Sequence, residues 1–265
     1  MSEKVTLNSL RTMKRAGEKI ACLTAYDASF AAQLDSAGVD ILLVGDSLGM
    51  VLQGEDTTLK VTLRDMIYHS RHVCRGAERA MVVVDMPFMS YVNTAQAVGN
   101  AARLVSEGGA EVVKMEGGAW LADTVQQLDA RGIPVCAHLG VLPQSVHKLS
   151  GYPVQGRNQR TADAIRKDAI VLQDAGAALL VLECVTRSVA KEIARTLEIP
   201  VIGIGAGNNC DGQVLVLYDV LGISGRQPRF SRNFLASNAT IQAAVEDYVR
   251  SVKSGEFPAP EHGFD

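Results

Sequence analysis

The sequence of 265 residues has few of the features that mark exported, membrane-spanning or nucleic-acid-binding proteins. Its apolar runs fall far short of the roughly 20 residues that a membrane helix needs, and its first residues, MSEKVTLNSL, lack the apolar core of a signal peptide. Its 26 basic and 29 acidic residues are scattered, without a basic stripe or an arginine-rich arm. We therefore expect a cytoplasmic protein with neither a membrane nor a nucleic acid as its partner.

Cysteine is also scarce and irregularly spaced, which argues against a disulfide framework. There are five cysteines, an odd number, and no two of them form a CxxC pair. Three lie in or beside apolar runs, as reduced thiols do in cytoplasmic proteins. A nucleophilic cysteine is an alternative that we do not favour, because the sequence places no base near any of them.

The sequence does contain eight short apolar runs, with helical patterns between several of them. Most runs are continuous rather than alternating, which is typical of strands buried on both faces. A strand–helix unit taken eight times predicts a (βα)8 TIM barrel, an α/β fold, formed as one domain by residues 1–265. The runs are 20–26, 41–45, 81–85, 111–116, 134–138, 178–183, 200–205 and 214–219.

An open, doubly wound sheet is the alternative fold, and it usually carries a GxGxxG loop after its first strand. This chain has AYDASF at that point. The glycine-rich GIGAGNN at 203–209 follows the seventh run instead, and the gap from Gly205 to the next run at Val214 is too short for a full helix. We therefore expect a barrel with a shortened seventh helical unit.

Some segments exceed what a barrel needs. The stretch 139–165 is long, polar and rich in glycine and proline, and after a fifth barrel strand it would lie over the C-terminal mouth, so we expect a lid. Residues 47–80 hold a loop and a further helix. The stretch 5–17 predicts a leading helix with Thr6 as its N-cap and Gly17 as its stop.

Acidic residues occur at the expected C-terminal ends of the strands, where barrel enzymes keep their chemistry. Carboxylates crowded into one mouth repel each other unless a cation neutralises them, and Mg²⁺ suits one to three carboxylates best. Zinc is disfavoured, because histidines and cysteines do not occur at ligand spacing. The acids are Asp27, Asp46, Asp85, Glu116, Glu183 and Asp219.

Helix capping is the alternative role for these acids. For Asp27 and Asp219 we favour it, because aspartate is a preferred N-cap residue. Asp46, Asp85 and Glu116 begin the stretches DSLG, DMPF and EGGA, which indicate loops rather than helical turns. We therefore predict that these three carboxylates form a metal site.

Three further polar residues belong to the same expected mouth. Lys114 shares a strand face with Glu116 and would bind a substrate carboxylate or tune the metal site. The alternative is that Lys114 forms a Schiff base with a carbonyl substrate. We disfavour it, because the nearby acids keep the Lys114 ammonium protonated. His138 would donate a hydrogen bond to the substrate or, alternatively, form its hydrogen bonds with the lid. Glu183 is a candidate general base, with a structural salt bridge as its alternative.

Several motifs are long enough to carry a family resemblance: LTAYDASFA, LLVGDSLGMVLQG, VVVDMPFMSY, VKMEGG, GYPVQGR, LLVLECV and IPVIGIGAG. Together they resemble the ketopantoate hydroxymethyltransferase family, from about residue 4 to the NFL at 233–235 and into the PAPEH tail. The resemblance implies a (βα)8 barrel related to the phosphoenolpyruvate mutase and isocitrate lyase group. It also implies a role in pantothenate biosynthesis and a homodecamer.

The same resemblance implies a reaction and a set of site residues. The hydroxymethyl group of 5,10-methylenetetrahydrofolate would pass to 3-methyl-2-oxobutanoate, giving ketopantoate through an enolate. Asp46 and Asp85 match the family's Mg²⁺ ligands, and Glu116 matches a further metal-associated carboxylate. By the same matching, Ser47 and Lys114 would hold the α-keto acid, and Glu183 would accept its proton.

Two other functions stay open at this point. A Mg²⁺-dependent C–C lyase of the isocitrate lyase type would share the barrel and bind an oxyacid in the same way. Such enzymes need a general acid, often a cysteine, on a loop over the site, and the stretch 139–165 contains none. A catalytically inactive barrel that serves as a scaffold is the second alternative, and the intact set of polar residues argues against it.

Overall fold

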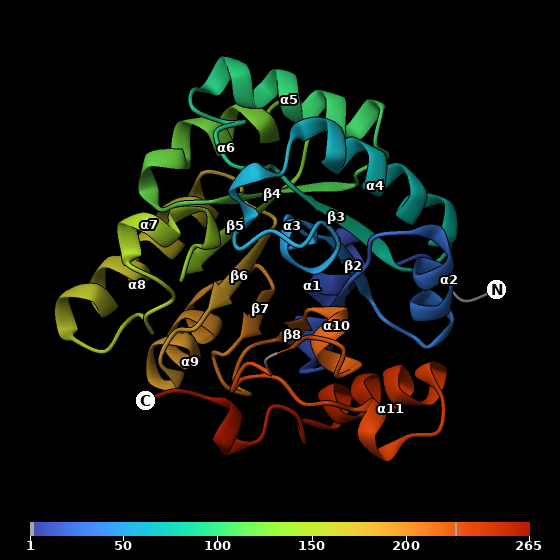
Figure 1. The fold of residues 1–265 in the computed structure, drawn as a ribbon. Coiled ribbons are helices and arrows are strands. Elements are labelled where there is room, and N and C mark those ends of the chain that lie inside the picture. The colour runs from blue at the N-terminus through green and yellow to red at the C-terminus, as the bar shows by residue number, and fades with distance from the viewer. Residues whose placement is uncertain (1–2, 226) are drawn as a thin grey trace.

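A computed structural model describes residues 3–225 and 227–265. Its centre is a closed barrel in which each strand pairs in parallel with its neighbours in chain order, and β1 pairs with β8 (Figure 1). The predicted (βα)8 barrel is therefore confirmed. The strands are β1 Ile20–Thr24, β2 Ile41–Val44, β3 Met81–Asp85, β4 Val112–Glu116, β5 Val135–Gly140, β6 Leu179–Glu183, β7 Val201–Ile204 and β8 Gly212–Leu215.

The longer helices surround this barrel, as Figure 1 shows. They are α2 Ala28–Ser36, α4 Leu63–Gly76, α5 Thr94–Ser106, α6 Ala122–Asp129, α8 Gln159–Asp174, α9 Arg187–Thr196 and α11 Ile241–Ser254. Short helical turns lie in the connections: α3 Leu48–Val51, η1 Thr58–Lys60, η2 Ala119–Leu121, η3 Pro143–Ser145, α7 Val146–Leu149, α10 Leu217–Val220, η4 Leu235–Ser237 and η5 Pro260–His262.

The leading helix α1, Leu7–Ala16, closes one end of the barrel. Thr6 caps it by accepting a 3.1 Å hydrogen bond from the Ser9 amide, and Gly17 ends it with a φ of 73°, both as predicted. Lys14 joins α1 to the residue before β8, because its Nζ lies 2.6 Å from Asp211 Oδ2. Since α1 covers the N-terminal ends of the strands, the C-terminal ends are the open mouth.

Two predictions concern the end of the barrel, and only the first is confirmed. The seventh unit is shortened as expected, because residues 205–211, all described, contain no helix. The eighth strand at 214–219 was wrong beyond Leu215, because the chain turns into α10 there. Asp219 lies inside that helix, so it is neither at a strand end nor an N-cap; the cap position is Val216.

The lid was predicted too long. Strand β5 continues to Gly140, and α8 begins at Gln159, where Asn158 accepts a 3.0 Å hydrogen bond from the Thr161 amide. The connection over the mouth is therefore residues 141–158, which we call the lid. The predicted stretch 139–165 was too long at both ends, because its first residues continue the buried strand β5 and its last residues belong to α8, which begins after the N-cap Asn158.

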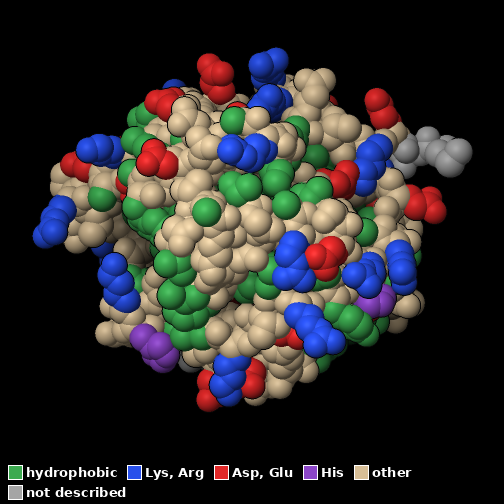
Figure 2. Space-filling view, turned by 90° about the horizontal axis from the view of Figure 1, so that it is seen from above, with side chains coloured by type: hydrophobic (Ala, Val, Ile, Leu, Met, Phe, Trp, Pro, Cys, Tyr) green, Lys and Arg blue, Asp and Glu red, His purple; other side chains and the backbone are tan. Residues whose placement is uncertain are grey.

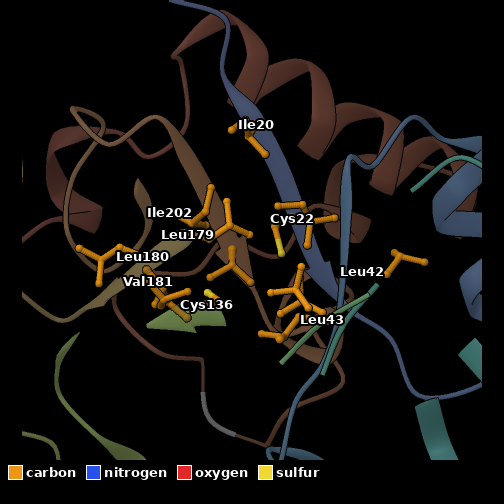
Figure 3. Packing of buried hydrophobic residues seen from close by; sticks show 14 of the residues in the cluster. Ile20, Cys22, Leu42, Leu43, Cys136, Leu179, Leu180, Val181 and Ile202 are labelled. Atoms are coloured by element: carbon orange, nitrogen blue, oxygen red, sulfur yellow. The ribbon is translucent and has the colours of Figure 1, made fainter. Parts of the chain in front are cut away.

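The interior of the barrel is apolar, and its side chains alternate along each strand. In Figure 3, Cys22, Leu179 and Ile202 point toward one another, whereas Leu42 and Leu180 point away. This period of two decides which residues of each strand face the barrel axis. Near the open mouth the inward positions become polar, and these are the predicted site residues.

The surface carries charges of both signs. On the face shown in Figure 2, the Lys and Arg side chains are interspersed with Asp and Glu, and neither sign forms a continuous patch. Within residues 3–225 and 227–265, no helix is both long enough and apolar enough to cross a bilayer.

Candidate active site

Adjacent strands carry most of the predicted site residues to the mouth. Strand register places Asp85 beside Lys114 and Glu116 beside His138. Glu183 ends β6 beside Gly140 of β5. Because β3 to β6 are consecutive around the barrel, these side chains form one continuous arc.

Contacts run along this arc from one residue to the next. Lys114 Nζ lies 2.7 Å from Asp85 Oδ1 and 3.3 Å from His138 Nδ1. His138 in turn lies 3.5 Å from Glu116 Oε1 through Nδ1 and 3.3 Å from Glu183 Oε2 through Nε2. The predicted residues therefore contact one another, and His138 connects Glu116 to Glu183.

Asp46 and Ser47 join this group from the end of β2. The Asp46 amide donates a 3.0 Å hydrogen bond to Asp85 Oδ2, and Ser47 Oγ lies 2.9 Å from the Tyr26 hydroxyl. A Cβ on Gly45 would lie 2.7 Å from Ser47 Oγ, so a larger residue at position 45 would displace the Ser47 hydroxyl. The residue type at position 45 thus keeps Ser47 close to the carboxylates.

The prediction that a loop follows Asp46 was wrong, because the chain enters α3 directly. Asp46 does not cap this helix either, because the N-cap position is Ser47 and no side chain makes a capping hydrogen bond. Asp46 Oδ2 instead accepts a 2.8 Å hydrogen bond from Gln144 Nε2 in the lid. Asp27 does cap α2, as predicted, by accepting a 2.9 Å bond from the Phe30 amide.

The carboxylates of the group are buried and repel one another. Asp46, Asp85 and Glu116 are only 3–4% exposed. Burial raises the pKa of Asp46 well above its ordinary value, and the charges of Asp85 and Glu116 raise it further. For Glu116 burial acts in the same direction, but contact with His138 and the charge of Lys114 outweigh it and lower the pKa.

Lys114 is the ammonium in contact with this group. Burial alone would lower its pKa, but the charges of Asp85, Glu116 and Asp46 outweigh burial and raise the pKa above its usual range. A Schiff base needs the neutral amine, so this environment disfavours the imine alternative. The ammonium is instead suited to binding an anionic group of a substrate.

His138 is also drawn toward its charged form. Burial and the nearby Lys114 would lower its pKa, but contacts with Glu116 and Glu183 raise it to about 8. His138 is 2% exposed, whereas the Glu183 side chain is 17% exposed. Glu183 is therefore the most accessible carboxylate of the arc and the one best placed to meet an entering molecule.

The donor set fits a hard divalent cation that keeps other ligands. Asp46, Asp85 and Glu116 offer only oxygen atoms, and together they carry more negative charge than Lys114 neutralises. Asp85 Oδ1 is buried without a hydrogen bond, although Lys114 is near. Among the described residues, no three His, Cys, Asp or Glu side chains are arranged to hold a metal alone. An ion here would therefore take its remaining ligands from water or substrate.

Comparisons with known proteins add to this geometry. The family model for ketopantoate hydroxymethyltransferase matches residues 4–260 of the chain. The chain belongs to this family. A 3-methyl-2-oxobutanoate hydroxymethyltransferase of Nitrosococcus oceani is 59% identical over 97% of this chain and 98% of its own. One from Methylococcus capsulatus is 55% identical over 100% and 98%, respectively.

Solved structures similar to this member of the ketopantoate hydroxymethyltransferase family share its barrel at low identity. A phosphoenolpyruvate phosphomutase from Streptomyces platensis subsp. rosaceus has a TM-score of 0.62 at 13% identity, covering 96% of this chain and 92% of its own. A 2,3-dimethylmalate lyase of the PEP mutase/isocitrate lyase superfamily has a TM-score of 0.59 at 16% identity, covering 82% of both chains. These structures therefore share the predicted barrel fold.

Sequence reasoning missed three polar residues of the ketopantoate hydroxymethyltransferase site. Tyr26 contacts Ser47, and Gln144 contacts Asp46, while Tyr91 contacts Gln144. All three lie within motifs or segments named above, Tyr91 at the end of VVVDMPFMSY, but nothing in their spacing distinguishes them. Their role depends on the path of the lid and of the loops after β1 and β3.

Proposed function

We propose that this protein transfers a hydroxymethyl group from 5,10-methylenetetrahydrofolate to 3-methyl-2-oxobutanoate, giving ketopantoate, the first step of pantothenate biosynthesis. The observation that carries the proposal is the buried group of Asp46, Asp85 and Glu116 beside the partly exposed Glu183. A buried excess of negative charge next to an accessible carboxylate suits an acid substrate that binds with a cation and loses a proton. The names of the relatives agree with this reaction.

Binding of the keto acid would use both charged and neutral donors. Lys114 supplies an ammonium for the carboxylate of the substrate, and Ser47 supplies a hydroxyl held by Tyr26. Asp46 and Asp85 would hold Mg²⁺, with Glu116 associated through water and His138 donating to the substrate. The bound ion would polarise the keto group and so increase the acidity of the adjacent C3–H bond.

Glu183 then acts as the general base. Its carboxylate takes the C3 proton, and the electron pair of the broken C–H bond forms the carbon–carbon double bond of the enolate. His138 Nε2, which is buried without a hydrogen-bond partner and lies 3.3 Å from Glu183 Oε2, is the nitrogen that would donate to the substrate beside this base. The methylene carbon of the folate is bonded to N5 and N10, and both of these carbon–nitrogen bonds break. One is replaced by the bond to C3 and the other by the bond to the oxygen of water, which becomes the hydroxyl of the product. The protons lost by C3 and by water go to the two nitrogens, which gives tetrahydrofolate.

A C–C lyase is the second candidate, supported by the lyases among proteins of the same fold. That chemistry needs a general acid over the mouth, and the lid, residues 141–158, contains no cysteine for this purpose. We also propose that residues 1–265 act as one domain, in the cytoplasm, within a homodecamer. Exposed apolar side chains such as Trp120 and Met89, 65% and 57% exposed, support an association between copies.

The experiment that tests the base follows C3 proton exchange by NMR, with the keto acid in D₂O and Mg²⁺ but no folate. Glu183→Gln keeps the shape of the side chain and removes its basicity, so we expect exchange to fall by about 10²- to 10⁴-fold. Glu198→Gln, on the surface after α9, is the matched control and should exchange normally. Near-normal exchange in Glu183→Gln would contradict the assignment of the base.

A further inference from the structure

One buried glutamine of the lid contacts two of the three carboxylates. Gln144 lies in η3 and is 7% exposed. Its Nε2 donates to Asp46 Oδ2 at 2.8 Å and to the Met86 carbonyl at 2.9 Å, and its backbone amide donates to Glu116 Oε2 at 2.9 Å. A single lid residue thus connects the ends of β2, β3 and β4.

The amide of Gln144 can be held in one orientation only. Both hydrogens of Nε2 face acceptors, while Oε1 accepts a 2.5 Å hydrogen bond from the Tyr91 hydroxyl. Turning the amide over would place Oε1 against the Asp46 carboxylate and the Met86 carbonyl. The Asp46 carboxylate and the Met86 carbonyl therefore decide which way the amide faces, and the Tyr91 hydroxyl, which also accepts a 3.3 Å bond from the Glu116 amide, holds Oε1 in place.

The chemical type of residue 144 matters for the charge of the site. A lysine or arginine at position 144 would neutralise Asp46 and compete with a bound cation. A carboxylate at that position would repel Asp46. A neutral amide donates to Asp46 Oδ2 and leaves the negative charge in place. By fixing Oδ2, Gln144 also fixes the plane of the carboxylate and the direction of its other oxygen.

We propose that Gln144, held by Tyr91, is a positioning residue that holds Asp46 and the base of the lid in the geometry that binds the divalent ion. This inference rests on the proposed function only in treating Asp46 as a ligand of that ion. Residues that hydrogen-bond metal ligands typically change metal affinity by 10- to 100-fold when they are replaced. Gln144 meets this description through its hydrogen bond to Asp46.

The test measures the affinity of the full chain for Mn²⁺ alone, by electron paramagnetic resonance, without substrate. Gln144→Met keeps the length of the side chain and removes its donors, so we expect Mn²⁺ to bind 10- to 100-fold more weakly. Gln159→Met is the matched control, because Gln159 is exposed at the start of α8 and bonds only Asp163. An affinity of Gln144→Met within twofold of the unmodified protein overturns the proposal.

A second variant covers the case in which Gln144→Met does not fold. Tyr91→Phe leaves Gln144 in place but removes the hydroxyl that holds its Oε1, so Mn²⁺ affinity should fall by about fivefold, the effect of one net hydrogen bond. An unchanged affinity in Tyr91→Phe overturns the proposal. The thermal midpoint in EDTA, measured alongside, detects a merely structural defect, which would lower the midpoint without changing the affinity of the folded protein.

Failure of the proposed function gives a different result. If the unmodified protein binds Mn²⁺ but neither exchanges the C3 proton nor transfers a hydroxymethyl group, the reaction is wrong. The ratio of Mn²⁺ affinities between Gln144→Met and the unmodified protein still decides the role of Gln144 in that case.

Discussion

Acidic residues lie at both ends of the barrel, but only at one end does each have cations of its own that neutralise it. At the N-terminal end, Asp40 precedes β2, pairs with Arg79 and Lys253, and accepts a 2.9 Å hydrogen bond from the Ala21 amide. Asp211 precedes β8 and accepts from Lys14 and from the Val201 amide. Each of these aspartates therefore has a cation and a backbone donor of its own.

At the C-terminal end three buried carboxylates share Lys114 and His138, whose pKa is raised to about 8 by its contacts with Glu116 and Glu183. Asp46 and Asp85 are as buried as Asp40, all 3–4% exposed, so burial does not distinguish the two ends. The difference lies in the charge that surrounds them. The carboxylates at the covered end have their charge balanced by their own cations, whereas the incompletely neutralised group at the open end is the one that we propose to bind a cation and a substrate.

The largest expected effect is on catalysis at the open end. Asp46→Asn should lower hydroxymethyl transfer by about 10³-fold, because the ion that polarises the substrate contributes several kcal/mol to the reaction. The same change should not lower the thermal midpoint in EDTA, since it removes a charge that repels Asp85 and Glu116. Steady-state assays and a thermal melt measure the two effects. Activity within tenfold of the unmodified protein would remove Asp46 from the ion site.

Addition of Mg²⁺ should raise the free energy of unfolding only when the carboxylates at the open end of the barrel are intact. At a concentration of one hundred times the dissociation constant, a ligand of the native state adds about 2.7 kcal/mol to the free energy of unfolding. We expect the unmodified protein and Asp40→Asn to gain this amount in denaturant titrations, and Asp46→Asn to lose most of it. Equal gains in all three proteins would place the ion elsewhere.

Replacement of Asp40 should affect stability and not chemistry. Asp40→Asn leaves Arg79 and Lys253 without their carboxylate, and we expect a loss of about 2 kcal/mol in the free energy of unfolding, below the usual cost because both cations are partly exposed. Urea unfolding measures the loss. The kcat of the folded variant should equal that of the unmodified protein, and a large decrease would show that the covered end also serves catalysis.

The smallest effect concerns Asp219, a buried acid outside both groups. Burial raises its pKa, although a hydrogen bond from Ser224 acts in the opposite direction. A raised pKa in the folded state means that ionisation costs stability above that pKa, while below the unfolded pKa near 4 the cost is absent. Asp219→Asn should therefore be slightly more stable than the unmodified protein at pH 7 and equal to it near pH 3. Thermal melts at both pH values check this, and a destabilised variant at pH 7 would contradict it.

The barrel could be predicted because its strands carry a local signal. Continuous apolar runs and the helical patterns between several of them are properties of short stretches, so eight strands were placed with errors of a few residues. The exception, the end of β8, depends on a contact that no local pattern shows: the Leu217 amide donates a 2.9 Å hydrogen bond to Thr24 Oγ1, 193 residues away. A short apolar run fits a buried helix as well as a strand.

The site residues also fall into those that a local sequence signal predicts and those that it does not. Asp85, Lys114, Glu116, His138 and Glu183 could be predicted to meet, because each lies at or near the end of a strand and strand ends converge in a barrel. Gln144 could not, since its place depends on how the lid folds back over the mouth. The roles assigned to these residues in catalysis stay predictions.

The position of α1 has a consequence for how the chain is made. This helix precedes all eight strands in the chain, yet Leu10 is fully buried and Lys14 bonds the Ala194 carbonyl and Asp211, which follow it by 180 and 197 residues. At 5–20 residues per second, α1 therefore waits on the order of ten seconds or more for its binding surface. During that interval its apolar side has no native partner, so nascent chains of this protein should depend on a chaperone that shields an amphipathic N-terminal segment.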